Sequence, residues 1–267
     1  MTSKKYIMEG SDESKRLDVK TDNAVTERQA LWAGIAPGMR VADIGCGAGK
    51  TTYKLHELVQ PGGSALGIDI AEQRVSYASA NYGDTGATFV CRDARQPLDD
   101  LGTFDFIWVR FLLEYYRAES FQMVQNISRM LKPGGTLLLI DLDHNCLCHY
   151  GLSERMDRAI HAVMGILESR MNFDPYVGRK LYSYLYDLGF NDIDVNVSAH
   201  HQIFGPLKVS DDFNWTKKVE VAARNSGYDF AEYPGGFEEF LLEFQTFFAD
   251  PRRFTYTPII CCRGVKG

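Results

Sequence analysis

Short apolar segments alternate with helix-like segments through the first half of the chain. The apolar segments have the length of strands and occupy residues 41–44, 64–70, 88–91, 104–109 and 136–142. Apolar side chains recur at helical spacing before and between them, in residues 24–35, 51–59, 71–81, 111–116 and 121–131. Strands that alternate with helices pair in parallel, and both faces of their sheet are covered. The pattern therefore predicts an α/β fold with a doubly wound, Rossmann-like, mostly parallel sheet.

The second half of the chain has a different pattern. Apolar residues recur at steps of three and four over 152–171, which predicts an amphipathic helix, and a further helix is expected over 177–188. Strands over 193–197 and 254–262 bring the predicted sheet to seven strands. A helix within 205–250 carries an aromatic stripe: Phe237, Phe240, Phe244, Phe247 and Phe248. Neither apolar stripe can stay exposed on a soluble monomer, so we expect the two to pack together or one to form a homodimer interface.

These patterns predict a core that is interrupted by two helical insertions. The expected parts are an N-terminal arm and ligand-binding core (1–145), a helical cap insertion (146–175), a continuation of the core (176–204), a second cap insertion (205–250) and a final core strand (251–267). Both insertions are expected to cover the carboxyl edge of the sheet. They would then enclose an apolar pocket of the kind that binds small molecules.

The composition narrows the classes of partner. The formal net charge is −6 and the chain has no run of Lys or Arg, which argues against nucleic acid because phosphate binding needs concentrated positive charge. No stretch approaches the ~20 apolar residues that span a bilayer, and the polar N-terminus differs from a signal peptide. Six cysteines without a secretory context indicate reduced thiols. We therefore expect a cytoplasmic protein without a membrane partner.

One cysteine-containing motif has the appearance of a metal site. Cys146-x-Cys148-His149 combines two thiols and an imidazole within four positions. A tetrahedral zinc site needs a second pair of ligands at a usable spacing, and the chain offers none. No metal site is predicted.

The segment 41–50 has the form strand, glycine turn, helix. Its glycines stand in the register Gly45-x-Gly47-x-Gly49. A dinucleotide fingerprint requires G-x-G-x-x-G, but position 50 is Lys, so a nicotinamide oxidoreductase is disfavoured. A P-loop requires Gly at position 44, which is Ile. The candidate ligands of this turn are a dinucleotide, a phosphate and S-adenosylmethionine. The glycine register disfavours the first two and leaves S-adenosylmethionine.

Acidic residues close the next two predicted strands. Asp69 ends the second strand, where a ribose lies in such folds and a carboxylate accepts hydrogen bonds from both hydroxyls. Asp93 follows the third strand, where a carboxylate accepts from an adenine amine and the N–H of Ala94 donates to a ring nitrogen. Both positions suit an adenosine ligand.

Five segments together resemble a known family. They are VADIGCGAG, GIDI, CRDA, FDFIWVRFLLEYY and LKPGGTLLLIDLD, in this order and at family-like spacing. With them the chain resembles the class I S-adenosylmethionine-dependent methyltransferases, in particular the small-molecule enzymes related to quinone-biosynthesis methyltransferases. The resemblance covers residues 1–145 well, residues 176–197 moderately and the rest hardly at all.

The resemblance also implies a cofactor site. The implied residues are Gly45, Cys46 and Gly47 at the methionine part, Asp69 and Ile70 at the ribose and adenine, Asp93 and Ala94 at the adenine, Arg110 at the methionine amino group, and Tyr6 and Arg16 from an N-terminal arm. The family uses S-adenosyl-L-methionine as its methyl donor. The expected activity is in-line methyl transfer to a small molecule, aromatic or polyketide-like by analogy.

Methyl transfer from a sulfonium needs a general base only when the nucleophile begins protonated. His144 follows the fifth strand and is our candidate for contact with the substrate, while His200 and His201 are alternatives and no catalytic residue is assigned. The alternative function is a protein of the same fold that binds S-adenosylmethionine without transferring a methyl group, as a regulator or a cofactor-remodelling protein would. Sequence alone leaves a monomer or a homodimer open.

Overall fold

The computed structural model describes residues 14, 17–18 and 21–267. Within these residues one eight-stranded sheet has the order β3-β2-β1-β4-β5-β8-β6, and β7 pairs with β8 outside that path. The parallel strands are β1 (Arg40–Ile44), β2 (Ser64–Asp69), β3 (Thr88–Cys91), β4 (Phe104–Arg110) and β5 (Leu131–Leu142). The predicted doubly wound, mostly parallel α/β fold is confirmed. The additional strand is the two-residue β6 (His149–Tyr150).

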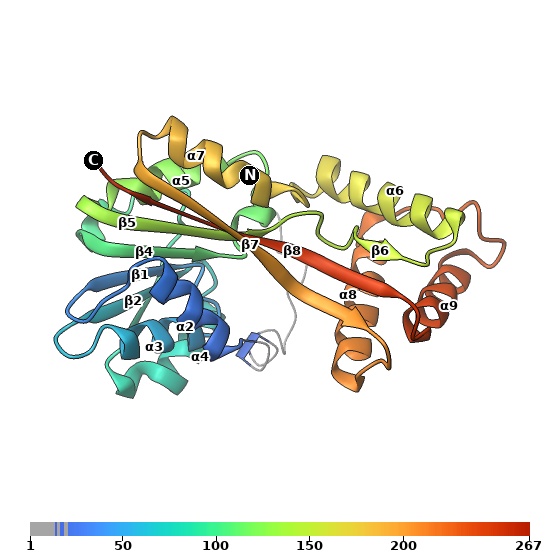
Figure 1. The fold of residues 1–267 in the computed structure, drawn as a ribbon, viewed down its shortest axis with the longest axis horizontal. Helices are drawn as coiled ribbons and strands as arrows, with labels where there is room; N and C mark the ends of the chain where they lie inside the picture. The colour runs from blue at the N-terminus through green and yellow to red at the C-terminus, as the bar shows by residue number, and fades with distance from the viewer. Residues whose placement is uncertain (1–13, 15–16, 19–20) are drawn as a thin grey trace.

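Helices cover both faces of the parallel strands (Figure 1). On one face α2 (Asn23–Trp32) and α3 (Lys50–Leu58) pack on a buried cluster that includes Trp108 of β4. On the other face α5 (Ser120–Arg129) and α7 (Leu181–Asp187) pack on a cluster that includes its neighbour Ile107. Successive strand residues thus enter opposite layers, as the two-residue period of a strand requires. The remaining helix beside the parallel strands, α4 (Glu72–Tyr82), lies against β2 and β3.

A third buried cluster lies beyond the carboxyl ends of the parallel strands. It is formed by α6 (Glu154–Arg170), α8 (Val209–Ser226) and α9 (Gly236–Ala249), which gather at one end of the molecule in Figure 1. The apolar stripe of α6 and the aromatic stripe of α9 both belong to this cluster. The two stripes predicted from sequence therefore pack against each other within one chain.

A long two-stranded ribbon carries α8 and α9. β8 (Phe254–Val265) runs antiparallel to β5 and to β7 (Asn191–Phe204), and its pairing with β7 continues to its first residue. The last residue of β5, Leu142, is opposite Ile259, so the first part of β8 and the part of β7 paired with it extend past the end of β5 (Figure 1). The ribbon places α8 and α9 beyond the carboxyl ends of the parallel strands (Figure 1).

Three local expectations need correction. The expected helix at 111–116 is a short 3-10 turn, Leu113–Tyr115, because Phe111 has a positive φ of 54° that no α-helix continues. The expected helix at 177–188 divides into a 3-10 turn, Val177–Lys180, and α7. The strand expected at 193–197 is the fourteen-residue β7. No helix in the described part of the chain is long and apolar enough to cross a membrane.

Candidate active site

The turn after β1 brings backbone N–H groups to the centre of the carboxyl edge. Gly45 and Cys46 donate to the carbonyl oxygen of Ile68 at 2.7 and 3.0 Å, which holds the turn against β2. Gly47 has a φ of 54° and donates to Oδ2 of Asp69 at 3.0 Å. A Cβ at Gly49 would lie 2.6 Å from that of Ala78, so Gly49 lets α3 approach α4 closely. The structure thus brings the predicted Gly45, Cys46 and Gly47 beside Asp69.

Asp69 is almost buried and is engaged with its own chain. Its Oδ1 accepts from the backbone of Ala71 at 2.9 Å and from Nε and Nη2 of Arg74 at 3.0 and 2.9 Å. With Gly47 on Oδ2, four donors meet a carboxylate that has about four acceptor positions. A ribose at Asp69 therefore competes with Arg74 for Oδ1. The side chain of Ile70, the next residue, is 39% exposed and presents an apolar surface at the same edge.

Asp93 lies on the loop after β3 and faces Arg95. The Arg95 side chain donates to both carboxylate oxygens at 2.7–3.0 Å, and its backbone N–H donates to Oδ1 at 2.9 Å. Partial burial raises the pKa of Asp93, but these hydrogen bonds outweigh it and the pKa is lower than the ordinary value. Ala94 is buried between the two. Asp93 is thus held in its charged, accepting form.

Asp43 of β1 lies at the centre of the carboxyl edge, although no sequence motif assigned it a role. It accepts from Oγ1 of Thr52 at 2.6 Å, and Arg110 on neighbouring β4 lies near enough to act on its charge. Burial, opposed by the Thr52 hydrogen bond and assisted by Asp69, raises the pKa of Asp43 to about 7. The signal available in the sequence was one acid inside an apolar strand.

Arg110 ends β4 on the other side of this point. Its guanidinium lies 4.3 Å from the ring centre of Phe111, and burial lowers its pKa to about 10, so it remains charged at neutral pH. The strand order reverses between β1 and β4, and ligands of doubly wound sheets bind at such a switch point. Asp43 and Arg110 therefore mark the expected ligand crevice.

The raised pKa of Asp43 predicts a pH dependence of stability. Because the folded state binds this proton more tightly than the unfolded chain, its contribution is complete below about pH 4 and is lost as the pH rises through about 7. In the wild type we expect the free energy of unfolding to decline by roughly 2 kcal/mol between about pH 5 and 7 because of this group. Asp43→Asn should remove that decline. Urea unfolding of both proteins at these pH values measures the difference.

Asp105→Asn is the matched control for this prediction. Burial raises the pKa of Asp105, but Lys132 and the backbone of Arg40 lower it more, so the net shift is downward. That carboxyl is charged throughout the tested range in both states, and its replacement should shift stability equally at each pH. Parallel curves for wild type and Asp43→Asn would show that Asp43 does not titrate here.

A series of hydrogen-bonded polar side chains connects β5 to α8. Asp141 on β5 is fully buried and accepts from the backbone of Leu113 and Glu114 at 3.0 and 3.3 Å. Its burial and the adjacent negative charge of Glu114 raise the pKa of Asp141 well above the ordinary value. Oε2 of Glu114 accepts from Nδ2 of Asn145 at 2.6 Å, and Oδ1 of Asn145 accepts from Nζ of Lys218 at 2.8 Å. These contacts join the loops after β4 and β5 to α8.

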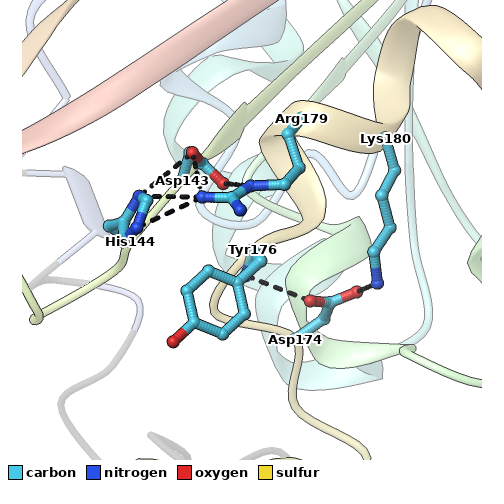
Figure 2. A network of polar contacts seen from close by, with 6 residues as sticks. All are labelled: Asp143, His144, Asp174, Tyr176, Arg179 and Lys180. Carbon is cyan, nitrogen blue, oxygen red and sulfur yellow. Dashed lines mark hydrogen bonds and ion pairs between the residues drawn. The ribbon is translucent and has the colours of Figure 1, made fainter.

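His144 belongs to a separate network of polar contacts (Figure 2). Arg179 donates from Nε to Oδ1 of Asp143 at 2.8 Å and from Nη2 to Nδ1 of His144 at 2.9 Å. Nδ1 of His144 also lies 3.2 Å from Oδ2 of Asp143, so it can accept from Arg179 or donate to Asp143, but not both in one neutral tautomer. The ring of Tyr176 meets His144 edge-on at 5.3 Å between centres. The side chain of His144 is 44% exposed, at the carboxyl edge where the sequence predicted it.

A cavity of about 70 Å³ lies between α6, α8 and α9. Apolar side chains of α6, α8 and α9 form most of its wall, and Tyr115, Asn145 and Lys218 are among the other residues that line it. His149 also lines it, and burial lowers the pKa of this imidazole to about 4, so it is neutral at ordinary pH. The sequence predicted an apolar pocket here but gave no sign of Lys218.

The structure does not bring every predicted residue to one place. Tyr6 and Arg16 lie outside the described residues. His200 lies on β7, where its ring contacts Phe111 at 4.8 Å, and His201 contacts Trp215 of α8 at 5.6 Å. Among the described residues no group of three or more His, Cys, Asp or Glu side chains is placed to hold a metal ion.

Comparison with known proteins supports a family assignment for the first half of the chain. Residues 41–135 match the family described as Methyltransferase domain. The demethylmenaquinone methyltransferase of Lactococcus lactis is 28% identical over 120 residues, which are 44% of this chain and 47% of that protein. The chain spans about half the length of the curated relatives it matches.

Solved structures share the fold along most of the chain. The Bacillus halodurans protein BH2331 has a TM-score of 0.59 and 17% identity, with 91% of this chain and 99% of that one covered. The [4+2]-cyclase SpnF has a TM-score of 0.54 and 18% identity, with 91% and 81% covered. At these identities the likeness concerns the fold.

Proposed function

We propose that the protein transfers the methyl group of S-adenosylmethionine to a small molecule, because residues 41–135 match the family described as Methyltransferase domain. One observation supports this most directly. The glycine turn lies at the β1–β4 switch point, Asp69 and Asp93 follow along the same carboxyl edge at the ends of β2 and β3, and an apolar cavity begins at the loops after β4 and β5. The proposed donor site and the proposed acceptor site are thus adjacent.

The residues at the edge fit the chemical groups of this cofactor. Gly45, Cys46 and Gly47 would follow its methionine part, and Arg110 would lie at the amino-acid end. Asp69 and Ile70 would hold the ribose and adenine, and Asp93 with Ala94 would bind the adenine edge. Tyr6 and Arg16 remain predictions for the same ligand. When bound, the cofactor supplies a methyl group activated by a sulfonium.

The protein's own contribution is chiefly alignment. Holding two reactants in attack geometry lowers a barrier by up to ~7–11 kcal/mol, and this reaction needs no acid at the leaving group. We propose that His144 contacts the acceptor. Arg179, through the hydrogen bond drawn in Figure 2, and Tyr176, through its ring contact, would fix the position of the His144 ring.

We further propose that residues 146–175 and 205–250 act as cap insertions on a core made of residues 1–145, 176–204 and 251–267. The proposed acceptor is apolar, because the cavity walls are mostly apolar, and its aromatic or polyketide-like character is proposed by analogy alone. The net charge of −6 disfavours nucleic acid as a partner. We propose a cytoplasmic enzyme, monomeric or homodimeric, without a membrane partner.

Cofactor identity is the first test. We expect S-adenosylhomocysteine to bind and NAD to bind far more weakly, because the carboxylates suit one adenosine while the glycine register does not suit a pyrophosphate. Titration calorimetry of the full chain with both ligands measures this. Tighter binding of NAD would contradict the proposal.

Transfer needs its own measurement, because a fold of this kind also occurs in SpnF, which is named a cyclase. Incubation with methyl-labelled S-adenosylmethionine and a small-molecule extract should give a labelled product that mass spectrometry identifies. Binding of the cofactor without labelled product across such extracts would favour a protein that uses the cofactor without transferring its methyl group.

A further inference from the structure

The cavity between α6, α8 and α9 combines apolar walls with one cationic group. Its walls include Ile160 and Val163 of α6 and Phe240 and Phe244 of α9. Lys218 of α8 lines the same space. We propose that this cavity binds an apolar small molecule through an anionic oxygen, a carboxylate or an enolate, which accepts hydrogen bonds from Lys218.

Lys218 has donors available for such a group. An ammonium carries three N–H donors, and among the described residues one goes to Oδ1 of Asn145 at 2.8 Å. Its Nζ lies 5.4 Å from the ring centre of Trp215, a contact that depends on the positive charge and leaves the N–H donors available. An anionic oxygen in the cavity would therefore add charge-assisted hydrogen bonds without displacing a protein contact.

The remaining polar groups of the cavity leave Lys218 as its one charged wall residue within the described part of the chain. The imidazole of His149 is neutral, since burial lowers its pKa to about 4. Glu114 lies behind Asn145, whose amide separates the carboxylate from the ammonium. A ligand with one negative charge would thus find one complementary charge in the cavity wall, that of Lys218.

The position of the cavity connects it to the proposed reaction, and the inference rests on that proposed function for the ligand's role as methyl acceptor. Tyr115 and Asn145 line the cavity and belong to the loops directly after β4 and β5. Those strands end beside the switch point. Binding the anionic group at α8 would orient the rest of the molecule between the cap and the cofactor edge.

The test compares two probes of one shape that differ in charge, propanoate and propanamide, which are small enough for a cavity of about 70 Å³. We expect calorimetry on the full chain to give at least about tenfold tighter binding of the acid, the size of a charge-assisted hydrogen bond. Lys218→Met should remove this preference while the amide still binds. Lys217→Met, which alters the exposed neighbouring lysine paired with Glu220, should retain it.

A second variant locates the probe, because charge alone does not. Met164→Trp fills the cavity from α6 and should abolish binding of both probes, while S-adenosylhomocysteine binds as in the wild type. Equal affinity for the two probes, or a preference that survives Lys218→Met, would overturn the inference. So would unchanged binding in a folded Met164→Trp protein. If the wild-type protein does not bind S-adenosylhomocysteine, the proposed function itself is overturned.

Discussion

Replacing Asp69 with alanine should weaken the binding of S-adenosylhomocysteine by at least about tenfold. A charge-assisted hydrogen bond to a ribose hydroxyl contributes roughly 1.5–3 kcal/mol, and about 1.4 kcal/mol corresponds to a factor of ten. The unliganded protein should also lose about 1–3 kcal/mol of stability, because the Gly47 N–H would remain buried without its acceptor. Calorimetric titration and urea unfolding measure the two effects separately.

Arg74→Met is the control that distinguishes direct from indirect action of Asp69. This change removes the ion pair on Oδ1 but leaves the hydrogen bonds from Gly47 and Ala71. If the ribose competes with Arg74, affinity should be unchanged or higher in this variant. An affinity loss equal to that of Asp69→Ala would mean that Asp69 acts by holding Arg74. Wild-type affinity in Asp69→Ala would place the ribose elsewhere.

Replacing Phe244 with alanine should have the largest effect on stability. Its side chain is fully buried in the cap, with its ring stacked on Phe248 at 5.4 Å between centres. Truncation of a buried phenylalanine costs about 3–5 kcal/mol. Affinity for S-adenosylhomocysteine should stay within about twofold, because distant sites without shared partners behave independently. Urea unfolding and calorimetry on the same preparation measure both.

Leu242→Ala provides the matched comparison on the same helix. Its side chain is 64% exposed, and a surface change of this kind is expected to stay within about 0.5 kcal/mol. Equal loss of stability and of cofactor affinity in Phe244→Ala would show that cap and cofactor edge are one unit. A change of sedimentation in that variant would indicate that α9 contributes to a homodimer.

Features that depend on neighbouring residues were predictable from the sequence. The glycine turn and the acids at the ends of β2 and β3 follow from short segments, and the structure places them together at one edge. The outer part of β7 was not predicted. Residues 198–204 lie on an edge strand with mostly exposed side chains, so they lack the alternation of apolar and polar residues that indicates a strand.

Features that depend on distant partners were also missed. The segment 111–116 is apolar and resembles a helix, but the carboxylate of Asp141 binds the N–H groups of Leu113 and Glu114 and holds a tighter turn. Lys218 meets Asn145 across more than seventy positions of sequence. No local pattern reports such a pair, because it exists only once the ribbon has placed α8 beside the sheet.

The two ends of the segment that contains α8 and α9 are cross-strand neighbours. Phe204 pairs with Phe254 with their rings stacked, and the Arg253 side chain donates to the carbonyl of Gly205 at 2.8 Å. Opposite residues of antiparallel strands are only about 5 Å apart, so whatever lies between them can change in length without straining the sheet. Residues 205–253 thus leave and re-enter the ribbon at a single junction, so this segment can change in length without altering the pairing of β7 with β8. Any segment that replaced it would still have to cover the apolar stripe of α6, which α8 and α9 now bury.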